Sequence, residues 1–226
     1  MKNWSLIILL YSLLTFQAKA KDPEASIFIE FLKNLAPATI YFTQSNTKEN
    51  FVNGWFALGN NGQARVEYEP PNDFVLVSDG EWLIFHEPHS FQTTHFPIEN
   101  GPFRALLNPS SIFDEDSNLY LISFKENDNK TYLKLSMEEN KDTYIPGSIT
   151  LIFQTNPINL LGWSIIDSQA NITNVSILSI EPGSQHKDRY GDDVFKLTEA
   201  VRNQGNIYRG PWEREPVAPP LSHRGN

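Results

Sequence analysis

Short segments of strand-like patterning, divided by turn residues, follow one another from Thr39 to Ile180. Two of the turns, Asn60-Asn61-Gly62 and Asp79-Gly80, carry residues that favour tight hairpins, and the second leads directly into Glu-Trp-Leu-Ile-Phe. The expected strands are Thr39–Gln44, Phe51–Leu58, Ala64–Tyr68, Phe74–Ser78, Trp82–His86, Gln92–Phe96, Leu119–Phe124, Thr131–Met137, Ser148–Gln154, Leu160–Asp167 and Ile172–Ile180. So many antiparallel strands rarely stay flat and open, and the sheet must therefore curl, close or be covered. The sequence predicts a mainly β (α+β) protein.

Two helices are expected beside these strands. The first runs from about Pro23 to Leu35, where a proline is tolerated in the first turn and Pro37 stops the helix. Its apolar residues recur at helical spacing: Ile27, Phe28, Phe31, Leu32 and Leu35. The second is a short helix within Pro102–Leu107. The apolar stripe of the first helix fits ordinary core packing or the wall of a ligand cavity.

Both ends of the chain differ from the strand-rich part. Residues 1–20 combine Lys2, an apolar run from Leu6 to Phe16 and the sequence Ala18-Lys19-Ala20. This is the pattern of a cleaved secretory signal peptide, and the run is shorter than the about 20 residues that span a bilayer. An uncleaved anchor is the alternative. Residues 205–226, rich in proline, glycine and charge, predict a disordered tail. Residues 21–204 then form one domain.

Composition excludes several classes of partner. The formal net charge is −9, which argues against nucleic acid and anionic membrane surfaces, because both reward clustered lysine and arginine. The chain has no cysteine, so neither a disulfide framework nor a lipid-modified cysteine is available. We expect a soluble monomer outside the cytoplasm.

No enzyme is predicted, and neither a cofactor nor a metal is expected. The sequence has no cysteine nucleophile, no Gly-x-Ser-x-Gly and no phosphate-binding glycine loop. His86 and His89 have a spacing that could pair on a metal at a turn, but histidines beside a proline are more often solvated. Glu67 and Glu69 fall on one strand face, and a solvated edge explains them.

An ordered set of short motifs carries a resemblance to a known family. The set comprises Phe42-Thr43-Gln44, Gly54-Trp55, Glu67-Tyr68-Glu69-Pro70-Pro71, Val77-Ser78-Asp79-Gly80, Gln92, Pro102-Phe103 and Leu106-Leu107. Behind a signal sequence and without cysteine, this order resembles the LolA family of periplasmic outer-membrane lipoprotein carriers. The resemblance extends over about Ala25 to Phe195.

The resemblance implies a fold and a function. The family fold is an unclosed antiparallel β-barrel of about eleven strands with an N-terminal helix and a lid of short helices. Such a carrier takes outer-membrane lipoproteins from an inner-membrane ABC transporter of the LolCDE type, shields their acyl chains in a hydrophobic cavity, and passes them to the receptor LolB. The receptor is itself a lipoprotein, so a chain without cysteine does not fit that role. The alternative is a lipid- or lipoprotein-sensing regulatory module of the same fold.

The resemblance also implies cavity and lid residues: Leu32, Ala64, Val66, Tyr68, Phe103 and Leu106. Each of them could equally be plain core. One departure concerns an arginine that relatives carry before the third strand and that is linked to lid closure and handover. Here Asn60 fills that position, and Arg65 is expected on the opposite strand face.

Overall fold

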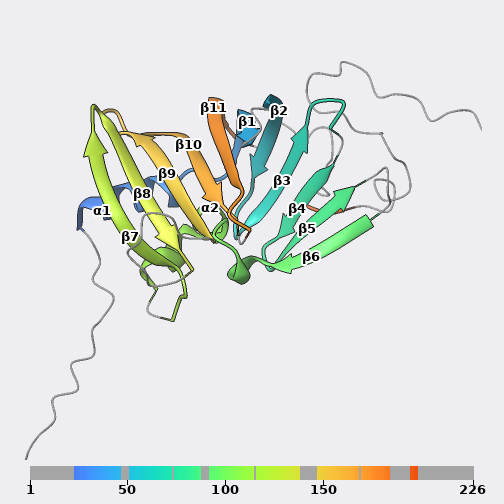
Figure 1. Ribbon diagram of the computed structural model, residues 1–226, viewed down its shortest axis with the longest axis horizontal. Coiled ribbons are helices and arrows are strands. Elements are labelled where there is room, and N and C mark those ends of the chain that lie inside the picture. Colours follow the sequence, from blue (N-terminus) through green and yellow to red (C-terminus); the bar gives the residue numbers. More distant parts are fainter. Residues whose placement is uncertain are drawn as a thin grey trace, which may run out of the picture.

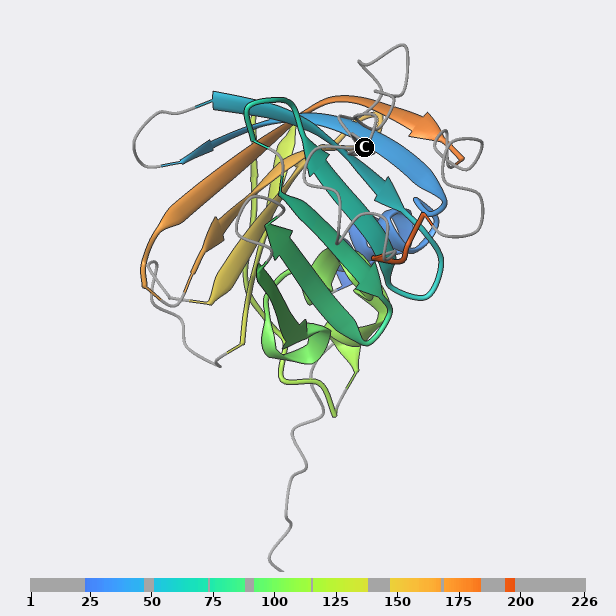
Figure 2. The same cartoon turned by 90° about the vertical axis from the view of Figure 1, so that its right-hand side faces the viewer.

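The computed structural model describes residues 23–46, 51–72, 74–87, 92–114, 116–137, 147–167, 169–183 and 194–197. The segments 1–20 and 205–226 lie outside the described residues, so the signal peptide, the tail and the domain bounds stay predictions. The described part is one 11-stranded antiparallel sheet that curls into an open half-barrel, with a helix and short helical turns against one face (Figures 1 and 2).

The bounds of the elements follow the expected pattern closely. The helical elements are α1 (Pro23–Lys33), η1 (Ile98–Asn100), α2 (Arg104–Leu107) and η2 (Pro109–Phe113), where η marks a 3-10 helix. The strands are β1 (Ala38–Asn46), β2 (Phe51–Leu58), β3 (Gln63–Tyr68), β4 (Val75–Asp79), β5 (Trp82–Glu87), β6 (Gln92–Pro97), β7 (Tyr120–Asn127), β8 (Lys130–Ser136), β9 (Ser148–Gln154), β10 (Asn159–Ile166) and β11 (Ile172–Pro182). The predicted fold class is confirmed.

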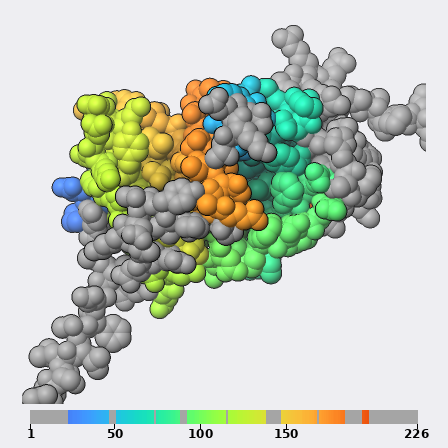
Figure 3. Space-filling model, in the orientation of Figure 1, coloured from blue at the N-terminus to red at the C-terminus, as the bar shows by residue number. Residues whose placement is uncertain are grey.

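The sheet order explains why the barrel stays open. It runs β6-β5-β4-β3-β2-β1-β11-β10-β9-β8-β7, so each half is a meander and the first and last strands pair at the centre. Strands β6 and β7 are the two edges. In the space-filling view, orange β11 lies between yellow-green β7 and β8 at one end and the green strands of the other half (Figure 3).

Turn chemistry fixes the register of the β2–β3 and β4–β5 hairpins. Asn61 and Gly62 both have positive φ, at 56° and 78°, as a two-residue hairpin turn requires. In the other turn, Gly80 has a φ of 108° and the Asp79 carboxylate accepts hydrogen bonds from the backbone N–H groups of Glu81 and Trp82. Both hairpins were predicted from these residues.

Helix α1 packs one face onto the sheet. Its buried residues are Ala25, Phe28, Ile29 and Leu32, which confirms the apolar stripe. The helix ends at Lys33, two residues before the predicted Leu35. The N–H of Asn34 is shared between two helix carbonyls, and the chain turns there to enter β1 after Pro37, which has no N–H to donate. The predicted helix within 102–107 is present from Arg104 to Leu107.

The two sheet faces differ in what covers them. We call the face toward α1 and α2 the inner face and the opposite one the outer face. Strand alternation places Ala64 and Val66 of β3 on the inner face and Arg65 and Glu67 on the outer face. Arg65 therefore does face away from the inner side, as expected.

The interpretation of Glu67 as part of a solvated edge is wrong. β3 lies inside the sheet, and Arg65 and Glu67 are both almost fully buried, with the guanidinium Nε donating to Glu67 Oε1 at 2.6 Å. Arg65 Nη1 also donates to the carbonyls of Val194 and Lys196, each at 3.3 Å. The segment 194–197 thus covers this part of the outer face, a contact between distant residues that a local pattern cannot reveal.

The expectation that the histidines near Pro88 are solvated is wrong for His86. His86 is a buried residue of β5, paired across the sheet with Val75 and Thr93, and its Nδ1 lies 2.9 Å from the Thr93 hydroxyl. His89 lies outside the described residues. Among the described side chains, no group of three or more His, Asp or Glu could hold a metal ion.

Candidate functional site

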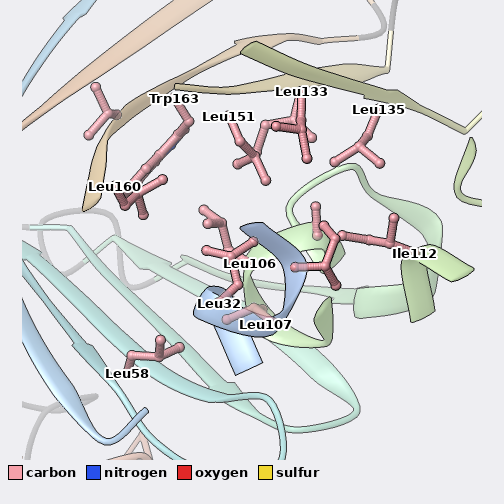
Figure 4. Close-up of a cluster of buried hydrophobic side chains, with 14 of the residues drawn as sticks. Leu32, Leu58, Leu106, Leu107, Ile112, Leu133, Leu135, Leu151, Leu160 and Trp163 are labelled. Atoms are coloured by element: carbon pink, nitrogen blue, oxygen red, sulfur yellow. The ribbon is translucent and has the colours of Figure 1, made fainter. Parts of the chain in front are cut away.

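An apolar interior lies between the inner face and the helical elements. Leu133, Leu151, Leu160 and Trp163 of β8 to β10 point toward Leu32 of α1 and Leu106 and Leu107 of α2 (Figure 4). These side chains all belong to one buried cluster that also takes in β1 to β3 and η2. The two halves of the sheet therefore meet the same helical cover, which we define as α1, η1, α2 and η2.

Aromatic contacts tie this cover to both halves of the sheet. The ring of Phe103, which precedes α2, lies 5.8 Å from that of Phe56 on β2 and 6.2 Å from that of Trp163 on β10. On α1, the ring of Phe28 lies 5.1 Å from that of Phe153 on β9. Ring pairs at such spacings add about 0.5–1.5 kcal/mol beyond area burial. The position of the cover is therefore set by packing against side chains on opposite sides of the curl.

A pocket of about 1130 Å³ opens beside the cover. The β2–β3 and β4–β5 turns form one wall, and α1, η1, α2 and η2 form the other. Leu32, Leu58, Leu106 and Leu107 contribute apolar surface, and all four also belong to the interior cluster. Its polar lining residues are Lys33, Asn60, Asn61, Glu81, Glu99, Arg104, Asn108 and Ser110.

The six residues that the resemblance singled out lie in one region. Leu32, Ala64, Val66 and Leu106 are buried in the interior cluster, and Tyr68 and Phe103 are half-buried against it. Leu32 and Leu106 also line the pocket. Whether any of them touches a lipid stays a prediction.

Sequence reasoning missed several pocket residues. Leu58, Leu107 and Ile98 contribute apolar wall, Trp82 is 43% exposed beside them, and Arg104 adds a charge. Leu107 was within reach, since it lies on the apolar side of the predicted short helix. No local pattern indicates that Arg104 faces a pocket.

Tyr68 gives the inner face a polar group away from the pocket. Its hydroxyl donates to Gln44 Oε1 at 2.9 Å, and its ring lies 4.3 Å from that of Phe74 and 5.6 Å from that of Phe42. Burial raises the pKa of the Tyr68 phenol well above its ordinary value. The phenol therefore stays neutral.

The backbone of the β2–β3 turn lies close to α2, which is part of the helical cover. Asn60, where the resemblance implies that relatives carry an arginine, lines the pocket. A β-carbon on Gly62 would stand 3.3 Å from the α-carbon of Gly80 and 3.6 Å from the carbonyl oxygen of Leu107 on α2. The Ser78 hydroxyl donates to the Gly62 carbonyl at 2.6 Å. Small residues let the two turns and α2 come close together here.

A sheet curled around an apolar interior, with a pocket at the edge of a helical cover, defines a class of proteins suited to holding apolar ligands. The sequence model of the family described as outer membrane lipoprotein carrier protein LolA matches residues 33–198, and the chain belongs to this family. It is a carrier family, typically periplasmic, without known catalytic activity, and membership implies lipoprotein-related partners. Among the described helices, none has the length and apolar character to cross a membrane.

Solved structures with a similar arrangement are remote in sequence. A LolA superfamily protein of Nitrosomonas europaea is 11% identical, with 75% of this chain and 98% of that chain covered and a TM-score of 0.37. A putative outer membrane lipoprotein-sorting protein domain of Vibrio parahaemolyticus is 7% identical, with 80% and 97% covered and a TM-score of 0.41. MucB in the Pseudomonas aeruginosa MucA/MucB complex is 11% identical, with 73% and 60% covered and a TM-score of 0.39. No curated protein matches the sequence.

Proposed function

We propose that this protein is a periplasmic chaperone that binds the acyl chains of lipoproteins. It receives outer-membrane lipoproteins from an inner-membrane ABC transporter of the LolCDE type and delivers them to an outer-membrane receptor of the LolB type. A cleaved signal peptide takes it across the inner membrane, and it acts as a monomer without a cofactor or a catalytic step. Leu32, Ala64, Val66, Tyr68, Phe103 and Leu106 are the proposed acyl-binding residues.

The observation that carries this proposal is the continuity between the pocket and the interior. Leu32 and Leu106 line the pocket on one side and belong to the buried cluster on the other. A shift of the cover would therefore extend the pocket into apolar surface. Each acyl methylene withdrawn from water contributes about 0.8 kcal/mol, so even a partial chain would offset the loss of some cover packing.

The construction of the cover supports reversible opening. Helix α2 has four residues and η1 has three, too few to be stable without tertiary packing. Their placement depends on side-chain contacts with the inner face, and an acyl chain makes contacts of the same chemical kind. Replacing one by the other needs no covalent change.

The test is release of a radiolabelled lipoprotein from spheroplasts by the purified mature protein. We expect release into the soluble fraction as a one-to-one complex. Leu106→Glu should abolish release, because it places a carboxylate in the apolar interior. Leu178→Glu is the matched control, since Leu178 is 64% exposed and this variant should release normally.

The folding of each variant is checked by circular dichroism, because Leu106 is buried. If Leu106→Glu unfolds, Ala64→Phe, which fills interior space from β3, takes its place. A folded wild-type protein that binds free lipid but releases no lipoprotein would contradict the carrier function and favour the sensing module of the same fold.

A further inference from the structure

We propose that the pocket recognises the anionic headgroup of an alkyl-chain amphiphile and that Arg104 is its counter-ion. The inference rests on the proposed function in one respect, that the adjoining interior accepts an alkyl chain. The new element is that the ligand must also carry a negative charge, which the shielding of apolar chains alone does not require.

Arg104 is a nearly buried charge that has no acidic partner among the residues that the structure describes. It lies on α2, lines the pocket, and is 9% exposed. Its Nη1 donates to the neutral side-chain oxygen of Asn118 at 3.2 Å. The ion pairs found within the described ranges are Lys33–Glu30 and Arg65–Glu67, so no described carboxylate lies within 4.0 Å of the Arg104 guanidinium.

The contrast with Arg65 shows how this fold otherwise treats a buried guanidinium. Arg65 has a carboxylate at 2.6 Å and two carbonyl acceptors on the outer face. Burying a charge without such compensation is costly, because a protein interior solvates it poorly. The guanidinium of Arg104 is therefore a group that an anion entering the pocket would stabilise.

The chemistry of the guanidinium limits which headgroups the pocket can bind. Arginine has five N–H donors in a planar fork, which matches two oxygens of a carboxylate or a phosphate. The contact with Asn118 involves one terminal nitrogen.

The other charged groups around the pocket are exposed. Lys33 already pairs with Glu30 at 3.7 Å, and Glu81 and Glu99 lie at the rim. Solvent and salt screen exposed charges, whereas an interaction with a nearly buried one keeps more of its strength. Glu81 and Glu99 oppose an anion only weakly for this reason.

The apolar wall of the pocket indicates that the rest of the ligand is apolar. Leu106 and Leu107 follow Arg104 by two and three residues on the same short helix, and both line the pocket. A ligand that satisfies the guanidinium therefore has apolar surface within reach. This combination fits a fatty acid carboxylate or the phosphate of a lipid.

The experiment compares ligands that share a chain and differ in the headgroup. Calorimetric titration of the full mature chain with decyl phosphate, decanoate, decanol, decyltrimethylammonium and inorganic phosphate separates headgroup from chain. We expect both anionic amphiphiles to bind about tenfold or more tightly than decanol, since a hydrogen bond to a charged group exceeds a neutral one by that order. The ratio of decyl phosphate to decanoate identifies the source of the anion.

Arg104→Met should remove this preference while leaving decanol binding unchanged. Lys125→Gln is the matched control and should bind all ligands like the wild type, because Lys125 is exposed on β7, away from the residues that line the pocket. If Arg104→Met does not fold, the wild-type series decides: equal affinity for decyl phosphate, decanol and decyltrimethylammonium overturns the proposal.

The two proposals fail in different ways. Binding of decanol without preference for the anions contradicts the role of Arg104 and leaves the acyl cavity standing. Absence of binding by every alkyl ligand contradicts both. If inorganic phosphate binds as tightly as decyl phosphate, the alkyl chain contributes nothing to the affinity. This result would overturn the proposal that the ligand is an amphiphile.

Discussion

The ring of Phe195 lies directly against Gly59, and a β-carbon on that glycine would stand 2.6 Å from two of the ring carbons. Gly59 directly follows β2 and opens the turn that reaches the pocket, whereas Phe195 belongs to the segment that covers Arg65. Residues separated by most of the chain thus meet at the base of this turn. This contact therefore links the segment 194–197, which covers part of the outer face, to the turn that forms part of the pocket wall.

We expect Gly59→Ala to lower the free energy of unfolding by about 1–3 kcal/mol, because the added methyl group overpacks this contact. Phe195→Ala should also destabilise the protein. In the double variant, Gly59→Ala should cost much less, because the ring it strikes is gone. Urea denaturation of all four proteins measures this coupling, and additive losses would contradict the contact.

The buried ion pair on β3 gives a second prediction. Arg65→Met should lower the free energy of unfolding by about 3–5 kcal/mol, since it leaves the Glu67 carboxylate buried without its counter-charge. The double variant Arg65→Met/Glu67→Leu should regain most of that loss. Chemical denaturation checks both, and a single variant as stable as the double would show that the charge of Glu67 is compensated elsewhere.

Tyr68 predicts how stability changes with pH. Burial raises the pKa of its phenol, so above about pH 10 the unfolded chain ionises while the folded one keeps its proton. The stability that this proton contributes is complete below about pH 10 and is lost as the pH rises further. Tyr68→Phe should cost about 1 kcal/mol at pH 8 through the lost hydrogen bond to Gln44 and then decline less between pH 8 and pH 11.

Tyr41→Phe is the control for this measurement. Burial, and then the Glu181 carboxylate, raise the pKa of Tyr41 as well, but this residue pairs with Trp55 on the outer face. Tyr41→Phe removes only the contribution of Tyr41, so the loss of stability between pH 8 and pH 11 that Tyr68 causes should remain. Parallel pH profiles for the wild type and Tyr68→Phe would contradict the assignment.

The turn glycine Gly62, near α2, can be tested against Gly101, where an added β-carbon would meet nothing within 4 Å. Gly62→Ala should lower the free energy of unfolding by about 1 kcal/mol or more, because φ is +78° and the new methyl group would crowd Gly80. Gly101→Ala has nothing within 4 Å and an extended φ of −137°, so it should be neutral or slightly stabilising. Thermal unfolding distinguishes them, and equal melting temperatures would argue against the strained turn.

The strands could be predicted because their signals are local. Alternation within β3 and the Asp-Gly turn before β5 need no information from elsewhere in the chain. The errors concern residues whose surroundings are distant. Glu67 is buried beside Arg65, which the segment 194–197 covers, and His86 is buried among neighbouring strands, so neither environment can be inferred from adjacent residues.

The residues of the candidate site could be predicted only from the resemblance to the LolA family. An apolar side chain such as Leu106 has the same character in a core and in a cavity wall, and here it lies at the boundary of both. The position of Arg104 beside the pocket depends on how α2 meets two turns of the opposite half of the sheet. Such a meeting is a property of the assembled fold.

The pairing of β1 with β11 has a consequence for how the protein is made. Ala38 lies opposite Pro182, so the central ladder of the sheet joins residues from nearly opposite ends of the described chain. The two meanders can form by short-range hairpins, but the ladder between them has to close a very long loop. A chain that emerges in order from its N-terminus therefore has no complete interior until its last strand arrives, and its two half-sheets depend on protection until then.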